Sequence, residues 1–371
     1  MTETVVHLGR ALFGETERAF LVAGEGRGEL SASTFRYGSG IEALRLSNGR
    51  GHLVVLPYYG QMIWHARLDG VDLNMKSMFD VPRPAADIAG TYGCFAFHSG
   101  LLRNGGPSPQ DTHALHGEMP CAPMDAATLH LGEDAEGPYL RLGGTREYVM
   151  GFGAHYLARP SVTLRPGSAV FDIAMEVTNV GGAPMDLMYM CHMNHAFVAG
   201  GRFVQPAPFT PEATKVRTAV PGHVRRNPRF DALIALLARD PAAMETLSEP
   251  EAYDPEQVFY LKGLKTDPAG LTHLMLLRPG GDGAVVSYAP DVFPHAVRWV
   301  LYNADQQVAA FALPSTCEPE GYLAEARKGH VRILPPGGKA AFTVRTGHLD
   351  REEAARMVEK IASLSHMGEP A

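Results

Sequence analysis

Short apolar runs separated by turn residues recur along the whole chain. In residues 41–69, three such runs are divided by Asn-Gly-Arg-Gly and by Tyr-Tyr-Gly, which is typical of successive hairpins. Residues 155–197 and 272–344 show the same organisation. The pattern predicts an all-β protein built from many short strands.

Two segments depart from this strand pattern. Residues 228–247 place Phe230, Ile234 and Leu237 at helical spacing. Residues 350–364 begin with an aspartate, which is a good N-cap residue, and continue with helix-forming residues. We expect both segments to be helices at the periphery of a β-structured body.

Composition agrees with a β-rich globular protein. Hydrophobic residues make up 45% of the 371 residues, and 40 glycines and 28 prolines leave little room for a helical bundle. The net charge is −7 and no long basic run is present, so the chain lacks the electrostatic signature of a nucleic-acid-binding protein. No window reaches the ~18 apolar residues of a membrane span, and the N-terminus does not resemble an export signal. We therefore expect neither a nucleic-acid nor a membrane partner.

The cysteines give a further indication of the compartment. The four cysteines are widely scattered along the sequence and form no Cys-x-x-Cys pair, which argues against a disulfide framework and a zinc site. The sequence thus favours a cytoplasmic protein.

The stretch MCHMNHAF, residues 190–197, contains two histidines three positions apart. If it is a strand, His192 and His195 lie on opposite faces, ~10 Å apart, too far to share a metal ion. His192 would then share a face with Asn194. On that face His192 is a candidate for polar chemistry. The alternative is a purely structural role, which is usual for a single histidine on an apolar strand.

Two other segments carry polar chemistry. Residues 97–120 are dense in histidine, glycine and proline, which predicts an ordered, irregular loop of the kind that often carries binding residues. Glu318 follows an apolar strand, where its carboxylate can project from the end of a sheet into a cleft. The alternatives are that residues 97–120 form an ordinary surface loop and that Glu318 is a solvated loop acid.

Taken in order, LHGEMP, LMYMCHMNHAF and the segment from FPHAVRWVLYN to CEPEGY resemble the aldose 1-epimerase (galactose mutarotase) superfamily. The likeness is greatest to its uncharacterised, aldose 1-epimerase-like branch. It implies a large antiparallel β-supersandwich with a few peripheral helices, over residues 29–347. Residues 1–28 would then be an N-terminal extension, and residues 348–371 a C-terminal helix and tail.

The resemblance also implies an activity. Members of the superfamily interconvert the anomers of a free monosaccharide or derivative without a cofactor or metal. A glutamate removes the proton of the anomeric hydroxyl and a histidine protonates the ring oxygen. Glu318 matches this base and His192 matches this acid. The partner implied is a small sugar, and the oligomeric state is not indicated.

Further residues match the superfamily's substrate-binding positions. His116 matches a histidine that hydrogen-bonds the sugar near its ring oxygen, and Arg103 stands where an arginine is common. Asn194 and Trp299 complete the expected substrate-binding set, Trp299 by offering a flat apolar face. The histidine strand reads CHMNHAF and differs from that of typical galactose mutarotases, so His195 is an alternative to His192 as the acid. Specificity for galactose therefore does not follow from the resemblance.

Several alternatives remain open at this point. The same acid/base pair could serve a sugar epimerase or an aldose–ketose isomerase, and a sugar-binding protein could retain the fold without catalysis. A phosphosugar would require a contact such as Arg103 or Lys262. Residues 204–256 do not match the superfamily pattern, so a substrate-contacting acid there, Asp254 or Glu256, is not defined.

Overall fold

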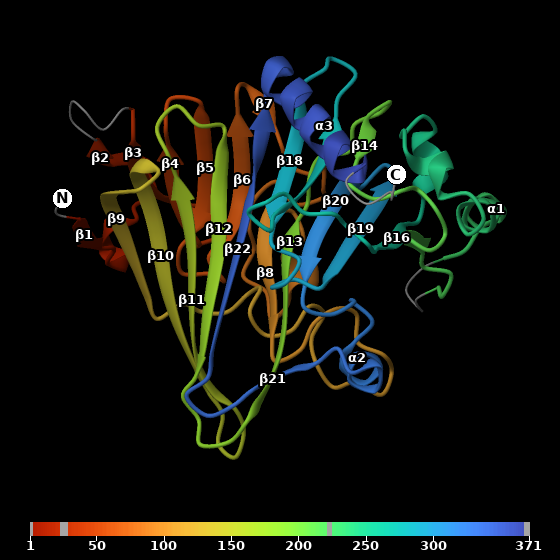
Figure 1. Ribbon diagram of the computed structural model, residues 1–371. Helices are drawn as coiled ribbons and strands as arrows, with labels where there is room; N and C mark the ends of the chain where they lie inside the picture. The colour runs from red at the N-terminus through yellow and green to blue at the C-terminus, as the bar shows by residue number, and fades with distance from the viewer. Residues whose placement is uncertain (1–2, 23–28, 221–224, 367–371) are drawn as a thin grey trace.

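Two antiparallel sheets pack face to face in the computed structural model, which describes residues 3–22, 29–220 and 225–366 (Figure 1). This architecture confirms the all-β supersandwich predicted from the sequence. The three hairpin-rich segments become strands of the two sheets, and the helices lie at the periphery (Figure 1).

The first sheet has nine strands. In spatial order they are β1 (Thr4–His7), β9 (Ala126–Asp134), β10 (Gly137–Val149), β11 (His155–Leu164), β12 (Val170–Asn179), β22 (Lys339–Leu349), β18 (Gly283–Tyr288), β17 (Thr272–Leu277) and β14 (Arg202–Val204).

The second sheet has thirteen strands and carries the candidate site. Its main path is β15 (Thr214–Val216), β16 (Gln257–Leu261), β19 (His295–Tyr302), β20 (Gln307–Ser315), β13 (Met185–Met193), β8 (Ala96–Leu101), β6 (Met62–Leu68), β5 (Gly51–Leu56), β4 (Glu42–Ser47), β3 (Ser31–Arg36) and β2 (Arg18–Val22). Two short strands complete it, since β21 (Arg332–Leu334) pairs with β13 and β7 (Val71–Asp72) pairs with β6.

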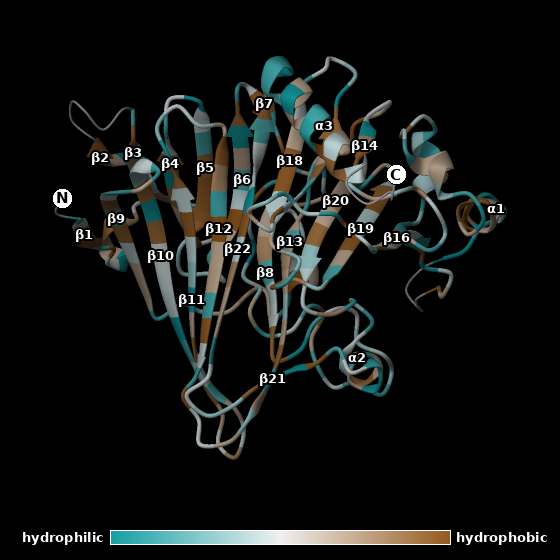
Figure 2. Cartoon of the chain, in the orientation of Figure 1, coloured by the Kyte–Doolittle hydropathy of each residue, from teal (hydrophilic) through white to brown (hydrophobic). Residues whose placement is uncertain are grey.

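The main core lies between the sheets. Along β11 and β12, buried residues alternate with partly exposed ones, as expected where one face of a strand packs inward. Val162 and Ile173 from the nine-stranded sheet belong to the same buried cluster as Leu53 and Phe311 from the thirteen-stranded sheet. Figure 2 shows this concentration of apolar residues along the strands.

Three α-helices are present in the described part of the chain: α1 (Pro228–Leu237), α2 (Tyr322–Lys328) and α3 (Arg351–His366). Four 3₁₀ turns accompany them, η1 (Arg10–Leu12), η2 (Ile88–Thr91), η3 (Pro241–Met244) and η4 (Pro250–Tyr253). No helix among the described residues is both long and apolar enough to cross a membrane.

The first helix is shorter than predicted. The helix expected over residues 228–247 ends at Leu237, and η3 follows it. Pro241 explains the break, because proline lacks the N–H that would continue the helix and restricts the residue before it. Helix α2 was not predicted, since its seven residues are too few to show a helical period.

The predicted cap of the last helix is formed. The Asp350 side chain accepts hydrogen bonds from the N–H groups of Glu352 and Glu353, and the Glu353 side chain accepts one from the N–H of Asp350. This reciprocal arrangement is a capping box, which satisfies free N–H groups at the start of the helix. The expected tail after the helix, residues 367–371, lies outside the described residues.

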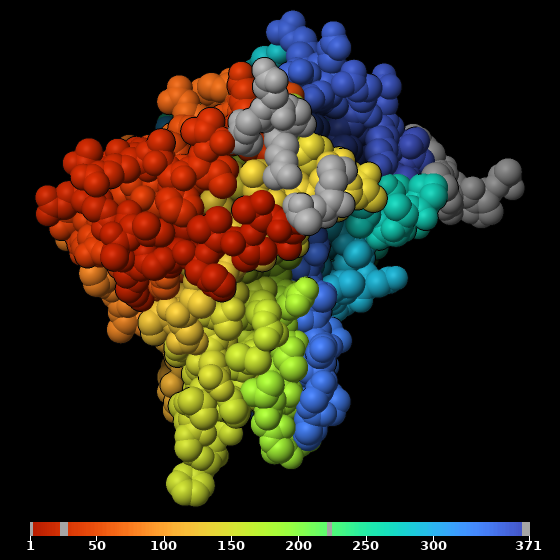
Figure 3. All heavy atoms as spheres, turned by 90° about the vertical axis from the view of Figure 1, so that its left-hand side faces the viewer, coloured from red at the N-terminus to blue at the C-terminus, as the bar shows by residue number. Residues whose placement is uncertain are grey.

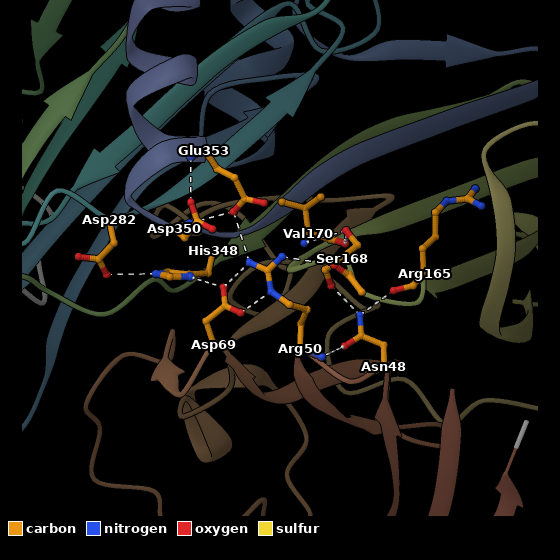
Figure 4. Close-up of polar contacts among 11 residues, drawn as sticks. Asn48, Arg50, Asp69, Arg165, Ser168, Val170, Asp282, His348, Asp350 and Glu353 are labelled. Carbon is orange, nitrogen blue, oxygen red and sulfur yellow. Dashed lines mark hydrogen bonds and ion pairs between the residues drawn. The ribbon is translucent and has the colours of Figure 1, made fainter. Parts of the chain in front are cut away.

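A polar network ties α3 to both sheets (Figure 4). His348 on β22 lies 2.7 Å from a carboxylate oxygen of Asp69 and 3.1 Å from one of Asp282. Arg50 binds Asp69 and also lies 3.3 Å from Glu353. Arg50 and His348 both act to lower the pKa of Asp69. The network therefore joins turns of the thirteen-stranded sheet to the nine-stranded sheet and to the helix.

The segment expected to be an N-terminal extension takes part in the fold. Strand β1 pairs with β9 of the nine-stranded sheet, and β2 pairs with β3 of the thirteen-stranded sheet. In Figure 3 this red segment covers one side of the body, while the hairpin of β10 and β11 projects below it. Residues 1–2 and 23–28 of the expected extension lie outside the described residues.

Candidate active site

His192 and His195 point to opposite faces of the sheet, as the strand alternation predicts. His192, on β13, packs against the rings of Phe97 and Tyr92. The Nε2 atom of His195 lies 3.2 Å from Oγ1 of Thr346, which belongs to the nine-stranded sheet. His195 therefore occupies the core between the sheets, and His192 lies on the outer face of the thirteen-stranded sheet.

Five rings form a compact group on this outer face, which we call the histidine cluster: Tyr92, Phe97, His116, His192 and Trp299. Phe97 stacks on His192 with ring centroids 4.5 Å apart, and His116 meets the same imidazole edge-on at 4.8 Å. Tyr92 contacts the other four rings, with centroids 5.8 Å from Trp299 and 6.1 Å from His192. The structure thus brings together three residues predicted from the sequence, His116, His192 and Trp299.

His116 reaches the cluster from an irregular loop. The loop predicted over residues 97–120 is irregular only after residue 101, because the first residues belong to β8 and pair with β13. The N–H of His116 donates to the carbonyl of Gly105 at 3.0 Å, and Oγ of Ser99 lies 2.9 Å from Nδ1 of the imidazole. The Ser99 contact engages Nδ1, and within the described part of the chain no hydrogen bond is formed by Nε2.

Two glutamates lie near the cluster, one immediately before β16 and the other in the segment between β20 and α2. Glu256, immediately before β16, accepts a hydrogen bond from Nε1 of Trp299 at 2.8 Å and pairs with Arg217 at 2.7 Å. Arg217 also lies 3.6 Å from Glu320, which accepts a hydrogen bond from the Tyr260 hydroxyl. A continuous row of polar groups therefore extends from the histidine cluster to Glu320.

Glu318 belongs to a different group of charges. Nζ of Lys328, at the end of α2, donates to its carboxylate at 2.6 Å. The buried carboxylate of Glu325 binds Lys328, His330 and the backbone N–H of Glu318. Among the described residues, no hydrogen bond or ion pair joins Glu318 to His192. In this structure α2 holds the Glu318 carboxylate at Lys328, and the role of Glu318 as the base stays a prediction.

Arg103 and Asn194 are also held by protein groups. The guanidinium of Arg103 lies 3.6 Å from the ring centroid of Tyr322 and pairs with Asp186 at 3.2 Å. Asn194 is 0% exposed, and its Nδ2 donates to the carbonyl of Cys94 at 3.0 Å. These contacts engage the Arg103 guanidinium and Nδ2 of Asn194, and the substrate-binding roles of both residues stay predictions.

Burial keeps the cluster histidines uncharged near neutral pH. It lowers the pKa of His116 to about 4, although Glu256 acts in the opposite direction. It also lowers the pKa of His192 well below its usual value, and the neighbouring His116 adds to this effect. Burial raises the pKa of the Tyr92 hydroxyl well above its usual value. The site therefore presents two neutral imidazoles and a protonated phenol beside the glutamates.

One set of side chains among the described residues has the spacing of a metal site, Glu318, Glu325 and His330. The ammonium group of Lys328 lies within hydrogen-bond distance of both carboxylates and is shared between them. This group therefore has the character of an ion-pair cluster that holds α2. The histidine cluster offers imidazole and phenol groups, and the adjacent Glu256 offers a carboxylate; all three can exchange protons with a hydroxyl.

Two cavities in the described part of the chain lie away from the cluster. One, of about 20 Å³, is lined by His195 and His348 between the sheets, and it has room for about one water molecule. The other, of about 170 Å³, lies against α3 and Phe203. Neither is lined by the cluster, so a ligand would approach His192 over its partly exposed neighbours, Tyr92 and Trp299.

Several site residues were missed or left undefined by the sequence. Tyr92 follows η2 in a segment without a motif, and Arg217 and Glu256 lie in or beside the stretch that shows no superfamily pattern. The sequence pattern favoured Glu318 in the CEPEGY element, and Glu320, two positions later, was not considered. The only signal for Glu320 in the sequence was that the CEPEGY element contains two acids, each of which is a candidate base.

Replacement of Gly117 by alanine should displace His116. Gly117 has a φ of +83°, and a Cβ there would lie 2.1 Å from the carbonyl oxygen of Arg103. We expect the free energy of unfolding to fall by about 1–3 kcal/mol, the usual strain of such a conformation. Any activity that uses His116 should fall up to about 10²-fold, since small misplacements are costly. Thermal unfolding and activity assays measure both effects.

Gly106 in the same loop provides the matched control. A Cβ there meets nothing within 4 Å, so Gly106→Ala should leave stability and activity close to wild type. Equal effects of the two substitutions would contradict the role of the tight turn at Gly117.

Solved structures share this fold over nearly their whole length. A candidate aldose 1-epimerase from Klebsiella pneumoniae matches with a TM-score of 0.78 at 18% identity, covering 99% of this chain and 97% of that one. A candidate aldose 1-epimerase from Escherichia coli matches with a TM-score of 0.53 at 14% identity, covering 82% and 97%. A galactose mutarotase-like protein from Clostridium acetobutylicum matches with a TM-score of 0.54 at 10% identity, covering 86% and 98%.

These similarities confirm, at the level of the fold, the resemblance predicted from the sequence. No curated protein matches the chain. One family model matches residues 38–347, most of the sequence, and its description is "Domain of unknown function (DUF4432)". The chain belongs to this uncharacterised family, whose fold here is that of the aldose 1-epimerase and galactose mutarotase-like proteins.

Proposed function

We propose that the protein is an isomerase that opens and recloses the ring of a free sugar and so interconverts its anomers. The observation that supports this best is the position of His192 and His116 beside Trp299, with Glu256 and Glu320 on the same face of the sheet. The reaction needs a base for the anomeric hydroxyl and an acid for the ring oxygen. Glutamate and histidine are suited to these two tasks near neutral pH.

In this proposal, Glu320 is the base and His192 supplies the proton for the ring oxygen. Both contacts described for Glu320 fall on Oε1, which leaves Oε2 for a substrate hydroxyl. Nε2 of His116 and the ring of Trp299 position the sugar, the latter by packing against C–H groups. Glu318 is assigned to the attachment of α2.

Exchange NMR of anomeric protons tests the proposal. Saturation of one anomer is followed by its transfer to the other, for a panel of neutral and phosphorylated aldoses and ketoses, with native and heat-inactivated protein. We expect the native protein to accelerate exchange for at least one sugar.

Two other outcomes would overturn this function in favour of a related one. Signals of a different sugar would indicate an epimerase or an aldose–ketose isomerase acting through the same groups. Line broadening of a sugar without faster exchange would indicate a sugar-binding protein.

The exchange rate should depend on pH in a defined direction. The histidine acts as an acid only when it is protonated, and burial lowers the pKa of His192 well below its usual value. We therefore expect kcat/KM to decrease as the pH rises from about 5 to about 8, instead of showing a histidine limb above about 7. Rates of anomer exchange in a series of buffers measure this, and a rate that increases over this range would contradict the assignment.

A further inference from the structure

Tyr92 is a more exposed neighbour of His192 in the histidine cluster. Its hydroxyl oxygen is 3.3 Å from Nε2 of His192, and its ring touches the rings of His116 and Trp299. Tyr92 is partly exposed, whereas His192 is 4% exposed. A substrate that lies on Trp299 therefore meets the phenol before it meets the imidazole.

The other nitrogen of His192 is closed to a substrate. Nδ1 is buried and has no hydrogen bond of normal geometry within the described chain. Asn194 lies behind it, and because its Nδ2 donates to Cys94, only the amide oxygen remains to face the imidazole. An interaction with the Asn194 side chain raises the pKa of His192, against the larger effect of burial. A proton on Nδ1 would face the amide oxygen of Asn194, and Nε2 would then accept the hydrogen bond from Tyr92.

We propose that Tyr92 exchanges the proton with the substrate, while His192 stands behind it as the proton reservoir and Asn194 fixes the orientation of the imidazole. This inference rests on the proposed function and changes which atom touches the sugar. The Tyr92 hydroxyl, the His192 imidazole and the Asn194 amide oxygen follow one another. Many active sites arrange a reacting group, a base and an orienting group in this order. Asn194, expected to bind substrate, becomes a positioning residue.

Ring opening starts from the form of the enzyme in which Nε2 of His192 has also taken up a proton from solvent. That proton moves to the phenol oxygen as the phenol proton moves to the sugar ring oxygen. The C1–O5 bond breaks with its electron pair on O5, and the proton of the anomeric hydroxyl passes to the base. Reclosure on the other face of C1 reverses each transfer, so Tyr92 and His192 return to their starting states.

Tyr92→Phe tests the relay, because it keeps the ring contacts and removes only the hydroxyl. We expect kcat to fall by about 10²-fold with KM little changed, which is a usual contribution of one proton transfer. In protein labelled with ¹⁵N-histidine, the Nε2 signal of His192 should also shift, since it loses its hydrogen-bond donor. The second measurement does not depend on activity.

Tyr189→Phe is the matched control. The Tyr189 hydroxyl lies 2.9 Å from Nδ1 of the buried His98, so this variant removes a similar contact away from the site. It should retain the wild-type kcat. Full activity of Tyr92→Phe, or an unchanged Nε2 signal, overturns the relay while leaving the proposed function intact. If the wild type accelerates no sugar, the proposed function fails instead, and the Nε2 signal alone decides whether Tyr92 binds His192.

Discussion

Replacement of His192 by glutamine is expected to slow anomer exchange by about 10²–10⁴-fold, the usual contribution of a general acid or base. Glutamine fills much of the same space between Phe97 and Tyr92 but cannot take up and release a proton. Sugar binding should persist, because Trp299 and His116 remain in place. Saturation-transfer rates and line broadening of the same sugar measure the two properties separately.

His195→Gln provides the control on the opposite face of the same strand segment. His195 packs against Phe95 and Phe311 and contacts Thr346, so its replacement disturbs the core between the sheets. We expect a lower melting temperature and nearly normal exchange per folded molecule. The reverse result, with exchange lost at His195 and kept at His192, would reject the assignment of the outer face as the active site.

The sequence allowed the strands and some site residues to be predicted because these depend on local pattern. Alternation along one strand was sufficient to separate His192 from His195, and the turn-rich pattern was sufficient to predict the sandwich. The position of Trp299 on a strand follows from the same periodicity. Each of these features is determined by residues close together in the chain.

The remaining site residues depend on tertiary contacts that no local pattern encodes. Tyr92 enters the cluster from a loop about 100 residues before His192, and Arg217 is placed by the pairing of β15 with β16. Our preference for Glu320 over Glu318 rests on the contacts of Glu318 with Lys328 and Glu325 on α2, a helix too short to be predicted. The motif predicts a carboxylate at this turn, and the choice between its two acids depends on tertiary contacts.

Glu320→Gln is expected to reduce exchange by about 10²–10⁴-fold as well, since the amide cannot accept the proton of the anomeric hydroxyl. Glutamine can still accept the hydrogen bond from Tyr260, so the local structure should be retained. The loss should appear mainly in kcat. Anomer exchange at saturating sugar, with circular dichroism as a check of folding, measures it.

Glu318→Gln tests the other carboxylate of the same turn by the same isosteric change. Its ion pair with Lys328 is partly exposed, so the expected cost in stability is about 1 kcal/mol or less, and exchange should stay close to wild type. Loss of exchange in Glu318→Gln with full activity in Glu320→Gln would restore the base predicted from the superfamily pattern. That result would assign the base to a carboxylate that is ion-paired with Lys328 in this structure. Comparison of the two glutamine variants therefore decides which carboxylate of the turn is the base.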